Sequence, residues 1–455
     1  MHHFAKIRIF SALGLAALLT ACASTPYHTP SVPTPGRFAH AEDTTGQGAN
    51  AASDLTDWWT AFNDPVLNSL VSNVLAKNND LSAAALRVQQ AKLQAGLTRL
   101  DQLPSANGNV GVSTGDATRW SASLGVSYEA DLWGRLAAAT RAANWEVQAT
   151  AEDREAARLA LIGTTAELYW RIAYTHQQIT VGEQNLAYAR KVLDLVTIQH
   201  KAGAVSGVEV SESEQSVNSQ IASLADLQQQ LVEYRSSLTV LLGGDPWPQT
   251  SEPQVLPDTP LPDVRAGLPA ELLGRRPDLR AAEWRLRETL ADVDIARTSL
   301  YPGLNLTASG GASSSELGAL FRNPTGSLAA SLSLPFLDFP RLNRNVKISE
   351  KTYDIAVLTF KTTLLQAFAD TDNALSARTQ LAQQADAQAA SLAAARKAES
   401  LYAVRYRTGS VALRIWLDAQ QSLRQEQLSY DNNRLSQLIN QSTLYQALGG
   451  GVPPQ

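Results

Sequence analysis

The sequence predicts a mainly α-helical protein with a small β part. Two observations lead to this fold class: very long stretches lack proline, and a few short segments alternate between apolar and polar residues. The clearest alternation lies in RWSASLGVSYEADLWGR, residues 119–135, where Trp120, Leu124 and Tyr128 share one face with Ala122 and Val126. Period-two alternation is typical of a strand with one apolar and one polar surface.

The composition is that of a folded protein with no affinity for nucleic acid. The chain has 455 residues, of which 44% are hydrophobic and 18% charged. The charged fraction is below the roughly 25% of an ordinary soluble domain. The net charge of -5 leaves no basic stripe that could neutralise phosphates, so nucleic acid is excluded as a partner.

Residues 1–21 have the pattern of a lipoprotein signal peptide. Lys6 and Arg8 precede an apolar run, 9–19, that is too short to span a bilayer. The run ends in LTAC, a bacterial lipobox pattern, which predicts cleavage before Cys22 and acylation of its thiol; Ala23 fits outer-membrane sorting. The alternative is an ordinary small-residue cleavage site with an incidental cysteine.

The segment after the signal peptide is expected to be a tether. Residues 22–53 are rich in Pro, Thr, Gly and Ala, a composition typical of flexible linkers. Cys22 is the only cysteine, so the chain cannot form an internal disulfide. No later segment is apolar for long enough to be a transmembrane helix, and any membrane-spanning part is therefore expected to be β.

Two halves of the chain, 54–242 and 278–448, carry the same pattern and are predicted to be internal repeats. NNDLSAAALRVQQAKL around Leu81 matches RPDLRAAEWRLRETL around Leu279, and LLGG matches ALGG near the two ends. Prolines crowd into the connection 243–277, and a tail, 449–455, follows. Each half is expected to form a helix, two strands, a long helix and a return helix. After the first helix the ranges are 105–113, 120–128, 135–200 and 207–242 in repeat 1, and 303–309, 327–336, 341–406 and 412–448 in repeat 2.

The predicted strands approach the ~9–11 residues that cross a bilayer when tilted. Four strands cannot close into a barrel, because bacterial spanning barrels need at least about eight. The chain is therefore expected to oligomerise. Two copies would give eight strands and a bore filled by side chains, whereas three would give twelve and leave room for water. The Ser-, Asn-, Thr- and Gly-rich polar faces favour a wet lumen.

The two long helices, 135–200 and 341–406, would each extend about 100 Å at 1.5 Å per residue. Such length requires side-by-side packing, and the apolar residues are spaced for it in coiled-coil steps. The outbound series is Leu358, Leu365, Phe368 and Leu375, and the return series is Leu428, Leu435, Leu438 and Tyr445. The alternative, separate amphipathic helices on a globular core, lacks a core sheet or second domain to receive them.

Taken together, these features resemble the TolC-like outer membrane factors, in particular the OprM/NodT-type efflux lipoproteins. The motifs that carry the likeness are WWTAFNDPVLNSLV (58–71), NNDLSAAALRV (78–88), SYEADLWGR (127–135), RRPDLRAAEWRL (275–286), RYRTGSVALRIWLDAQQSL (405–423) and ALGGG (447–451). The resemblance implies a homotrimer with a 12-stranded transmembrane β-barrel, a periplasmic α-helical barrel and a mixed equatorial belt. We expect that belt at about 54–80, 243–277 and the C-terminus.

The resemblance also implies partners and a role. The chain would be the passive outer-membrane exit duct of a tripartite efflux system, joined through a periplasmic adaptor to an inner-membrane pump that supplies the energy. The alternatives within this reading are a duct for type I protein secretion and a structural coiled-coil envelope lipoprotein. No cofactor is expected apart from the covalent lipid on Cys22.

The two helix reversals are the expected adaptor-contact tips. Gly203 and Gly409 lie at corresponding points, where a reversing helix needs positive φ. By resemblance the tips dock the adaptor, and the further candidate contacts are Ala204, Arg405, Tyr406, Arg407 and Ser410. The alternative for the glycines is a purely structural helix cap.

A carboxylate follows each tip, Glu212 in repeat 1 and Asp418 in repeat 2. By resemblance, Asp418 lines the periplasmic aperture, where three copies would form a ring of negative charge that attracts cations. The alternative is a solvated helix charge. Arg414 departs from the pattern expected there, and a pair with Asp418 at i, i+4 would weaken the ring.

Trp120 and Tyr128, near the two ends of one strand, are candidates for the aromatic girdles at the membrane interfaces. Core packing against a helix is the alternative. An enzyme is not expected: the histidines are scattered, no thiol is free once Cys22 is acylated, and no Gly-rich phosphate loop follows a strand. No metal site is expected either.

Overall fold

The structure is a computed structural model that describes residues 24–41, 57–115, 117–264 and 269–450. The predicted signal peptide and Cys22 lie outside the described residues, as do most of the tether and most of the tail. The described chain is mostly helical with one small antiparallel sheet, which confirms the predicted fold class at this level.

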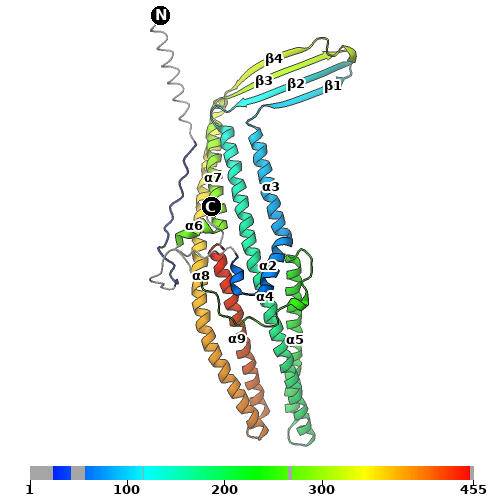
Figure 1. Cartoon of the computed structure of the whole chain (residues 1–455), viewed down its shortest axis with the longest axis vertical. Helices are drawn as coiled ribbons and strands as arrows, with labels where there is room; N and C mark the ends of the chain where they lie inside the picture. Colours follow the sequence, from blue (N-terminus) through cyan, green and yellow to red (C-terminus); the bar gives the residue numbers. More distant parts are fainter. Residues whose placement is uncertain (1–23, 42–56, 116, 265–268, 451–455) are drawn as a thin grey trace. The chain divides into compact units, whose positions relative to one another are not determined.

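One order of elements occurs twice along the chain (Figure 1). The first series contains η1 (Trp58–Phe62), α2 (Pro65–Lys77), α3 (Asn79–Leu100), β1 (Ser105–Ser113), β2 (Arg119–Ala130), α4 (Arg135–Lys201) and α5 (Gly207–Leu241). After η2 (Gln249–Ser251), the second series contains η3 (Pro269–Glu271), α6 (Leu272–Arg275), α7 (Pro277–Thr298), β3 (Gly303–Ser314), η4 (Leu317–Ala319), β4 (Thr325–Ser333), η5 (Pro335–Asp338), α8 (Phe339–Arg407) and α9 (Leu413–Ala447).

The helix ends lie within two residues of the predicted ones, but both strands of the second half differ. The predicted strand 327–336 is shifted: β4 begins at Thr325 and ends at Ser333. Pro335 has no N–H for a ladder bond, and it opens the short helix η5 instead. The predicted strand 303–309 is too short, because β3 continues to Ser314.

The described residues form two compact units. Unit 1 contains residues 24–33, 84–154 and 278–364, and unit 2 contains residues 34–41, 57–83, 155–264, 269–277 and 365–450. The units do not follow the two predicted halves, since each takes segments from both. Helices α3, α4, α7 and α8 each contribute residues to both units.

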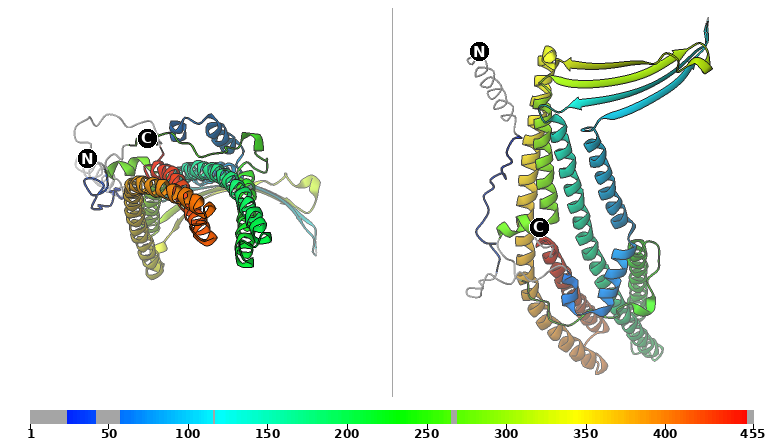
Figure 2. Two further views of the ribbon diagram at one scale, coloured as in Figure 1. Left: turned by 90° about the horizontal axis from the view of Figure 1, so that it is seen from below. Right: turned by 45° about the horizontal axis from the view of Figure 1, so that its top comes forward.

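In unit 1 the strands form one antiparallel sheet in the order β1-β2-β3-β4, which curves along its strands (Figure 2). The register places apolar residues opposite apolar ones across the sheet: Val126 pairs with Ala106 and Ala308, and Ala308 pairs with Leu328. The other face carries polar and small residues, since Ser123 of β2 pairs with Asn109 of β1 and with Gly311 of β3. The whole sheet therefore has one apolar and one polar face.

The helices of unit 1 follow the order of the strands. Gln102, in the loop before β1, donates to the Leu136 carbonyl of α4 at 3.1 Å. Helix α4 pairs with α7 through Arg280 and Glu152, a largely buried ion pair with an N–O distance of 2.5 Å. Helix α7 pairs with α8 through Arg297 and Glu350 at 2.8 Å. The order α3-α4-α7-α8 leaves α3 and α8 at the two sides.

Unit 2 contains two helical hairpins, formed by residues 155–201 of α4 with α5 and by residues 365–407 of α8 with α9. Its core includes an aromatic cluster in which Trp58 stacks on Tyr445 at 5.1 Å and Phe62 packs on Trp170 at 4.9 Å. The capping of α2 fits this core: Asp64 accepts from the Val66 and Leu67 amides. Trp58 and Phe62 belong to the motif WWTAF and Tyr445 lies near the end of α9, two parts of the expected equatorial belt, whereas Trp170 comes from α4.

The proline-rich connection is fixed to unit 2 by one buried carboxylate. The side chain of Glu252 is 1% exposed and accepts from Arg235 at 2.8 and 2.6 Å and from His176 Nε2 at 2.6 Å. Burial alone would raise the pKa of Glu252, but the hydrogen bonds from Arg235 and His176 lower it overall. The connection is therefore ordered by a paired charge and not only by its prolines.

Candidate functional site

Both hairpins of unit 2 end in a glycine with left-handed backbone. The φ angles of Gly203 and Gly409 are 72° and 73°. A Cβ at either position would meet no atom within 4 Å, so glycine is required by the backbone angle and not by a close neighbour. This conformation ends a helix and turns the chain back without leaving its last carbonyls unpaired.

The hydrogen bonds of the two turns are the same. In each, the glycine N–H and the next N–H donate back to the last turn of the helix, the pattern of a Schellman cap. The bonds are Gly203 to His200 and Ala204 to Gln199, both 2.9 Å, and Gly409 to Tyr406 and Ser410 to Arg405, 2.9 and 2.8 Å. This geometry accounts for both glycines without invoking a partner protein.

The return helices begin differently. Ser206 caps α5 in a capping box with Glu209, whose carboxylate accepts from the Ser206 amide at 3.0 Å. These hydrogen bonds from Ser206 hold the pKa of Glu209 below its ordinary value. Ala412 is the N-cap residue of α9, and its side chain cannot accept a capping hydrogen bond. The tip of the second hairpin is therefore held less firmly at this end than the first.

An aromatic cluster joins the two hairpins near their tips. Tyr406 stacks on Trp416 with centroids 5.2 Å apart, and its hydroxyl donates to Gln199 Oε1 at 2.9 Å. Trp416 is buried and donates from Nε1 to Glu399 Oε1 at 3.0 Å. Tyr188 of α4 meets the face of Trp416 edge-on at 5.9 Å. The α8–α9 hairpin is thus fastened to α4 by apolar burial and by hydrogen bonds.

Most predicted tip residues are solvent-exposed. Gly203, Gly409 and the side chains of Ala204, Arg405, Arg407 and Ser410 are accessible in the single chain. Tyr406 differs, because it is half-buried in the aromatic cluster and its hydroxyl is already paired. As a candidate for direct adaptor contact, Tyr406 is therefore weaker than its neighbours.

The aperture candidates Asp418, Arg414 and Glu212 lie on the two return helices. Asp418 is exposed. Arg414 Nη1 lies 4.0 Å from Glu212 Oε1 of α5, a different partner from the i, i+4 pair with Asp418 that the sequence suggested. At this distance, with Arg414 76% exposed, the pair contributes little to stability. It nevertheless directs Arg414 toward the first hairpin.

Trp120 and Tyr128 lie on the apolar face of the sheet, both partly exposed. Around them that face exposes large apolar side chains to the surroundings. Their exposed fractions are 78% for Val110, 61% for Leu124, 41% for Leu306 and 87% for Leu328. A soluble protein rarely exposes such a continuous apolar surface. Both aromatic residues are therefore placed as a lipid-facing surface requires.

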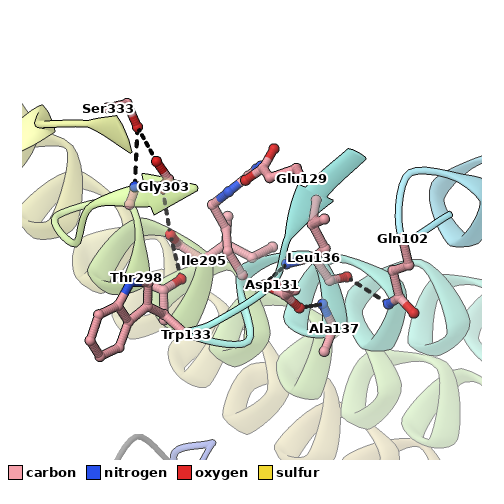
Figure 3. A network of polar contacts seen from close by, with 12 residues as sticks. Gln102, Glu129, Asp131, Trp133, Leu136, Ala137, Ile295, Thr298, Gly303 and Ser333 are labelled. Carbon is pink, nitrogen blue, oxygen red and sulfur yellow. Dashed lines mark hydrogen bonds and ion pairs between the residues drawn. The ribbon is translucent and has the colours of Figure 1, made fainter. Parts of the chain in front are cut away.

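The turn between β2 and α4 makes polar contacts that the sequence analysis missed, and Figure 3 shows Trp133 and the cap formed by Asp131. Trp133, in the turn between β2 and α4, stacks on Tyr301 at 4.9 Å and donates to the Pro302 carbonyl at 2.8 Å. Asp131 accepts from the Leu136 and Ala137 amides and so caps α4. The motif DLWGR could have revealed this, since Asp before Gly and a helix is a capping signal.

A groove of about 590 Å³ in unit 1 has four charged side chains among small and uncharged polar ones. Glu146 and Asp153 come from α4, Glu288 from α7 and Arg87 from α3. Arg285 ion-pairs with Asp153 and lies 3.8 Å from Glu146. Burial, with the nearby charges of Glu146 and Asp292, raises the pKa of Glu288 to about 7.

Two further features concern the helices and the potential metal ligands of the described residues. Among the helices in the described ranges, none has the length and hydrophobicity needed to cross a membrane. The part of the chain that the structure describes also contains no cluster of three or more His, Cys, Asp or Glu side chains placed to hold a metal ion.

A family model described as outer membrane efflux protein matches residues 70–244 and 268–450. The chain belongs to this family. It is 34% identical to the pyoverdine export outer membrane protein OpmQ of Pseudomonas aeruginosa, over 98% of this chain and 97% of that protein. It is 30% identical to the toluene efflux pump outer membrane protein TtgC of Pseudomonas putida, over 96% and 94%.

Solved structures agree with this assignment. The open state of the Neisseria gonorrhoeae MtrE outer membrane channel matches with a TM-score of 0.80 and 28% identity, over 94% of this chain and 98% of that one. The expected TolC-like relationship is confirmed. The protein is an outer-membrane efflux channel that spans the outer membrane and extends into the periplasm, and it is not an enzyme.

Replacing Gly203 by alanine should destabilise the first tip, whereas the same change at Gly207 should not. Gly203 has φ of 72°, where an L side chain costs about 1 kcal/mol. Gly207 is the first residue of α5, and alanine is favoured in a helix. Hydrogen exchange of the tip amides should accelerate about fivefold in Gly203→Ala only. Equal exchange in the two variants would contradict the cap.

Replacing Glu288 by glutamine should stabilise unit 1 at pH 8 and not at pH 4.5. The raised pKa means that ionisation of Glu288 costs stability once the pH exceeds its unfolded value, and this cost is complete above about pH 7. Removing the charge should therefore raise stability by roughly 1–2 kcal/mol at pH 8, measured by thermal unfolding in detergent. An equal gain at both pH values would contradict the electrostatic cause.

Proposed function

We propose that the protein is the exit duct of a tripartite efflux system, through which small molecules pass after a periplasmic adaptor opens it. The observation that carries this proposal is the sheet, which has one exposed apolar face, one polar face and two open edges. A sheet of this kind is one segment of a barrel wall, apolar toward lipid and polar toward a water-filled lumen. Family membership supports the same reading.

The open edges support a homotrimer. Within the described residues β1 and β4 each pair with only one neighbour, so each leaves a row of backbone N–H and C=O groups unpaired. In a bilayer these groups must be paired with protein, because lipid offers no hydrogen bonds. Pairing β4 of one copy with β1 of the next, around three copies, gives a closed 12-stranded barrel.

The helices of unit 1 support the same assembly. The side helix α3 exposes apolar residues at coiled-coil spacing, Leu86, Leu93, Leu97 and Leu100, with exposed fractions between 57% and 73%. The side helix α8 exposes a similar series, Ile348, Ile355 and Leu358, at 63% to 64%. Helix α3 leads into β1 and α8 follows β4, so closing the sheet would bring α8 of one copy to α3 of the next. Such contacts would continue the wall as a helical barrel.

The internal repeats belong to the proposal as well. Both halves end in paired glycines with positive φ, Gly243 and Gly244 in one and Gly449 and Gly450 in the other. Three copies of a two-repeat chain would give the wall a near-sixfold pattern. The lipid anchor on Cys22, with no other cofactor, rests on the LTAC motif and on an outer-membrane location.

The remaining parts of the proposed mechanism concern the hairpin tips and the aperture. The exposed tip residues bind a periplasmic adaptor. The channel has no energy source of its own, so an inner-membrane pump drives transport. Three exposed Asp418 carboxylates around a threefold axis would form the ring that attracts cations to the aperture. The named roles of OpmQ and TtgC, in pyoverdine export and toluene efflux, favour small molecules over proteins as cargo.

The test is conductance in planar lipid bilayers. Purified wild-type protein should conduct with a preference for cations, and Asp418→Asn should lower the cation-to-anion permeability ratio about twofold or more. Asp386 is an exposed carboxylate on α8, far in sequence from the tips. Asp386→Asn is therefore the matched control and should leave the ratio unchanged. Absence of conductance in assembled wild-type protein would contradict the duct, and an unchanged ratio in Asp418→Asn would contradict the ring.

A further inference from the structure

Thr25, near the start of the described chain, is hydrogen-bonded to an aspartate of α7, a contact called the Thr25 clasp below. The Thr25 amide lies 3.1 and 3.3 Å from the two carboxylate oxygens of Asp294, and the Thr25 hydroxyl donates to Oδ1 at 2.6 Å. Asp294 lies in the C-terminal half of α7, and its side chain is only 12% exposed. A charged acceptor that holds both donors of one residue is a strong, directional contact.

Two arginines complete the clasp. Arg141 of α4 lies 3.5 Å from Asp294 Oδ2, and Arg297 of α7 donates to the Thr25 hydroxyl oxygen at 3.4 Å. Both arginines lie next to the carboxylate and the hydroxyl that bind each other, so they help to hold the Asp294 side chain against Thr25. The residues that hold Thr25 therefore come from two neighbouring helices of unit 1, so the contact depends on the folded unit.

A second contact gives the direction of the segment. Arg287 lies between the rings of Tyr27 and Trp284, 4.6 Å from each centroid, and Trp284 stacks on Trp145. Arg287 precedes Asp294 by two helical turns. From Thr25 to Tyr27 the chain therefore runs toward the start of α7.

Thr25 is close in sequence to the proposed lipidation site and is bound near the end of α7. An extended chain from Cys22 to Thr25 spans at most about 10 Å. Helix α7 ends at Thr298, about 6 Å beyond Asp294 at 1.5 Å per residue. The aromatic pair Trp133 and Tyr301, typical of a membrane interface, follows within a few residues, and β3 begins at Gly303.

We propose that Asp294, with Arg141 and Arg297, is a positioning site that holds the chain directly after the acylated Cys22. It fixes the lipid anchor at the level where the strands enter the inner face of the outer membrane. The lipid and the sheet then enter the bilayer as one unit. This inference rests on the proposed lipidation of Cys22 and extends it.

Disulfide trapping tests the clasp in the acylated, membrane-inserted protein. Thr25→Cys combined with Asp294→Cys should form an intramolecular disulfide, since acylation removes the only native thiol. Thr25→Cys with Asp292→Cys is the control, because Asp292 lies on a different side of α7 from Asp294. The first pair should give at least about tenfold more disulfide than the second, given the short range of disulfide geometry. Equal yields would overturn the clasp.

Hydrogen exchange resolved to single amides is the second readout, and it needs no cysteine. Asp294→Asn should raise the exchange rate of the Thr25 amide about tenfold, because the charged acceptor is lost. Asp292→Asn should leave that rate unchanged. A Thr25 amide that exchanges at the free-peptide rate in wild-type protein would overturn the proposal.

Intact mass and bilayer conductance separate this inference from the proposed function. A diacylglyceryl group on Cys22 supports the anchor position, and an unacylated Cys22 in a conducting channel would overturn it while leaving the duct intact. Conductance should be unchanged in Asp294→Asn, because Asp294 is not part of the lumen or the tips.

Discussion

The unpaired backbone groups along β1 and β4 are the constraint on which the rest of the structure depends. In water such edges can be satisfied by solvent, but in lipid each unpaired group costs several kcal/mol. The apolar face of this sheet, with Leu328 87% exposed, suits lipid and not water. In the proposed assembly, other copies of the same chain pair with these edges and close the sheet into a barrel.

The helices that continue from the sheet also expose apolar residues that need a partner surface. Helices α3 and α8 flank unit 1 as β1 and β4 flank the sheet, and both expose apolar stripes at coiled-coil spacing. In unit 2 the contacts are made within the chain: Phe368, Leu375, Leu435 and Leu438 are buried, and Trp416 and Tyr406 join the hairpins. In the proposed assembly, neighbouring copies therefore cover the side helices of unit 1, while the aromatic cluster of unit 2 is packed within one chain.

Periodicity and proline placement were enough to predict the helices and the strand β2. Trp120 and Tyr128 fall on the apolar face because alternation is a local property of a strand. The end of β3 could not be predicted in this way, because Gly310 and Gly311 carry no side chain that shows a period. Their pairing with β2 decides the length of the strand.

In the candidate site, too, the sequence predicted local features but not contacts between distant residues. The glycine caps at Gly203 and Gly409 follow from local backbone chemistry, and the sequence predicted them. The partner of Arg414 was predicted from helix spacing, but the structure gives Glu212 of another helix. The contacts of Thr25 with Asp294 and of Trp133 with Tyr301 join distant parts of the chain, which no local pattern specifies.

Native mass spectrometry of the protein released from detergent micelles tests the central claim most directly. If the open edges of the sheet are closed by further copies, the protein should appear as three chains. A homogeneous single chain that retains its sheet, under conditions that preserve known membrane oligomers, would contradict the account.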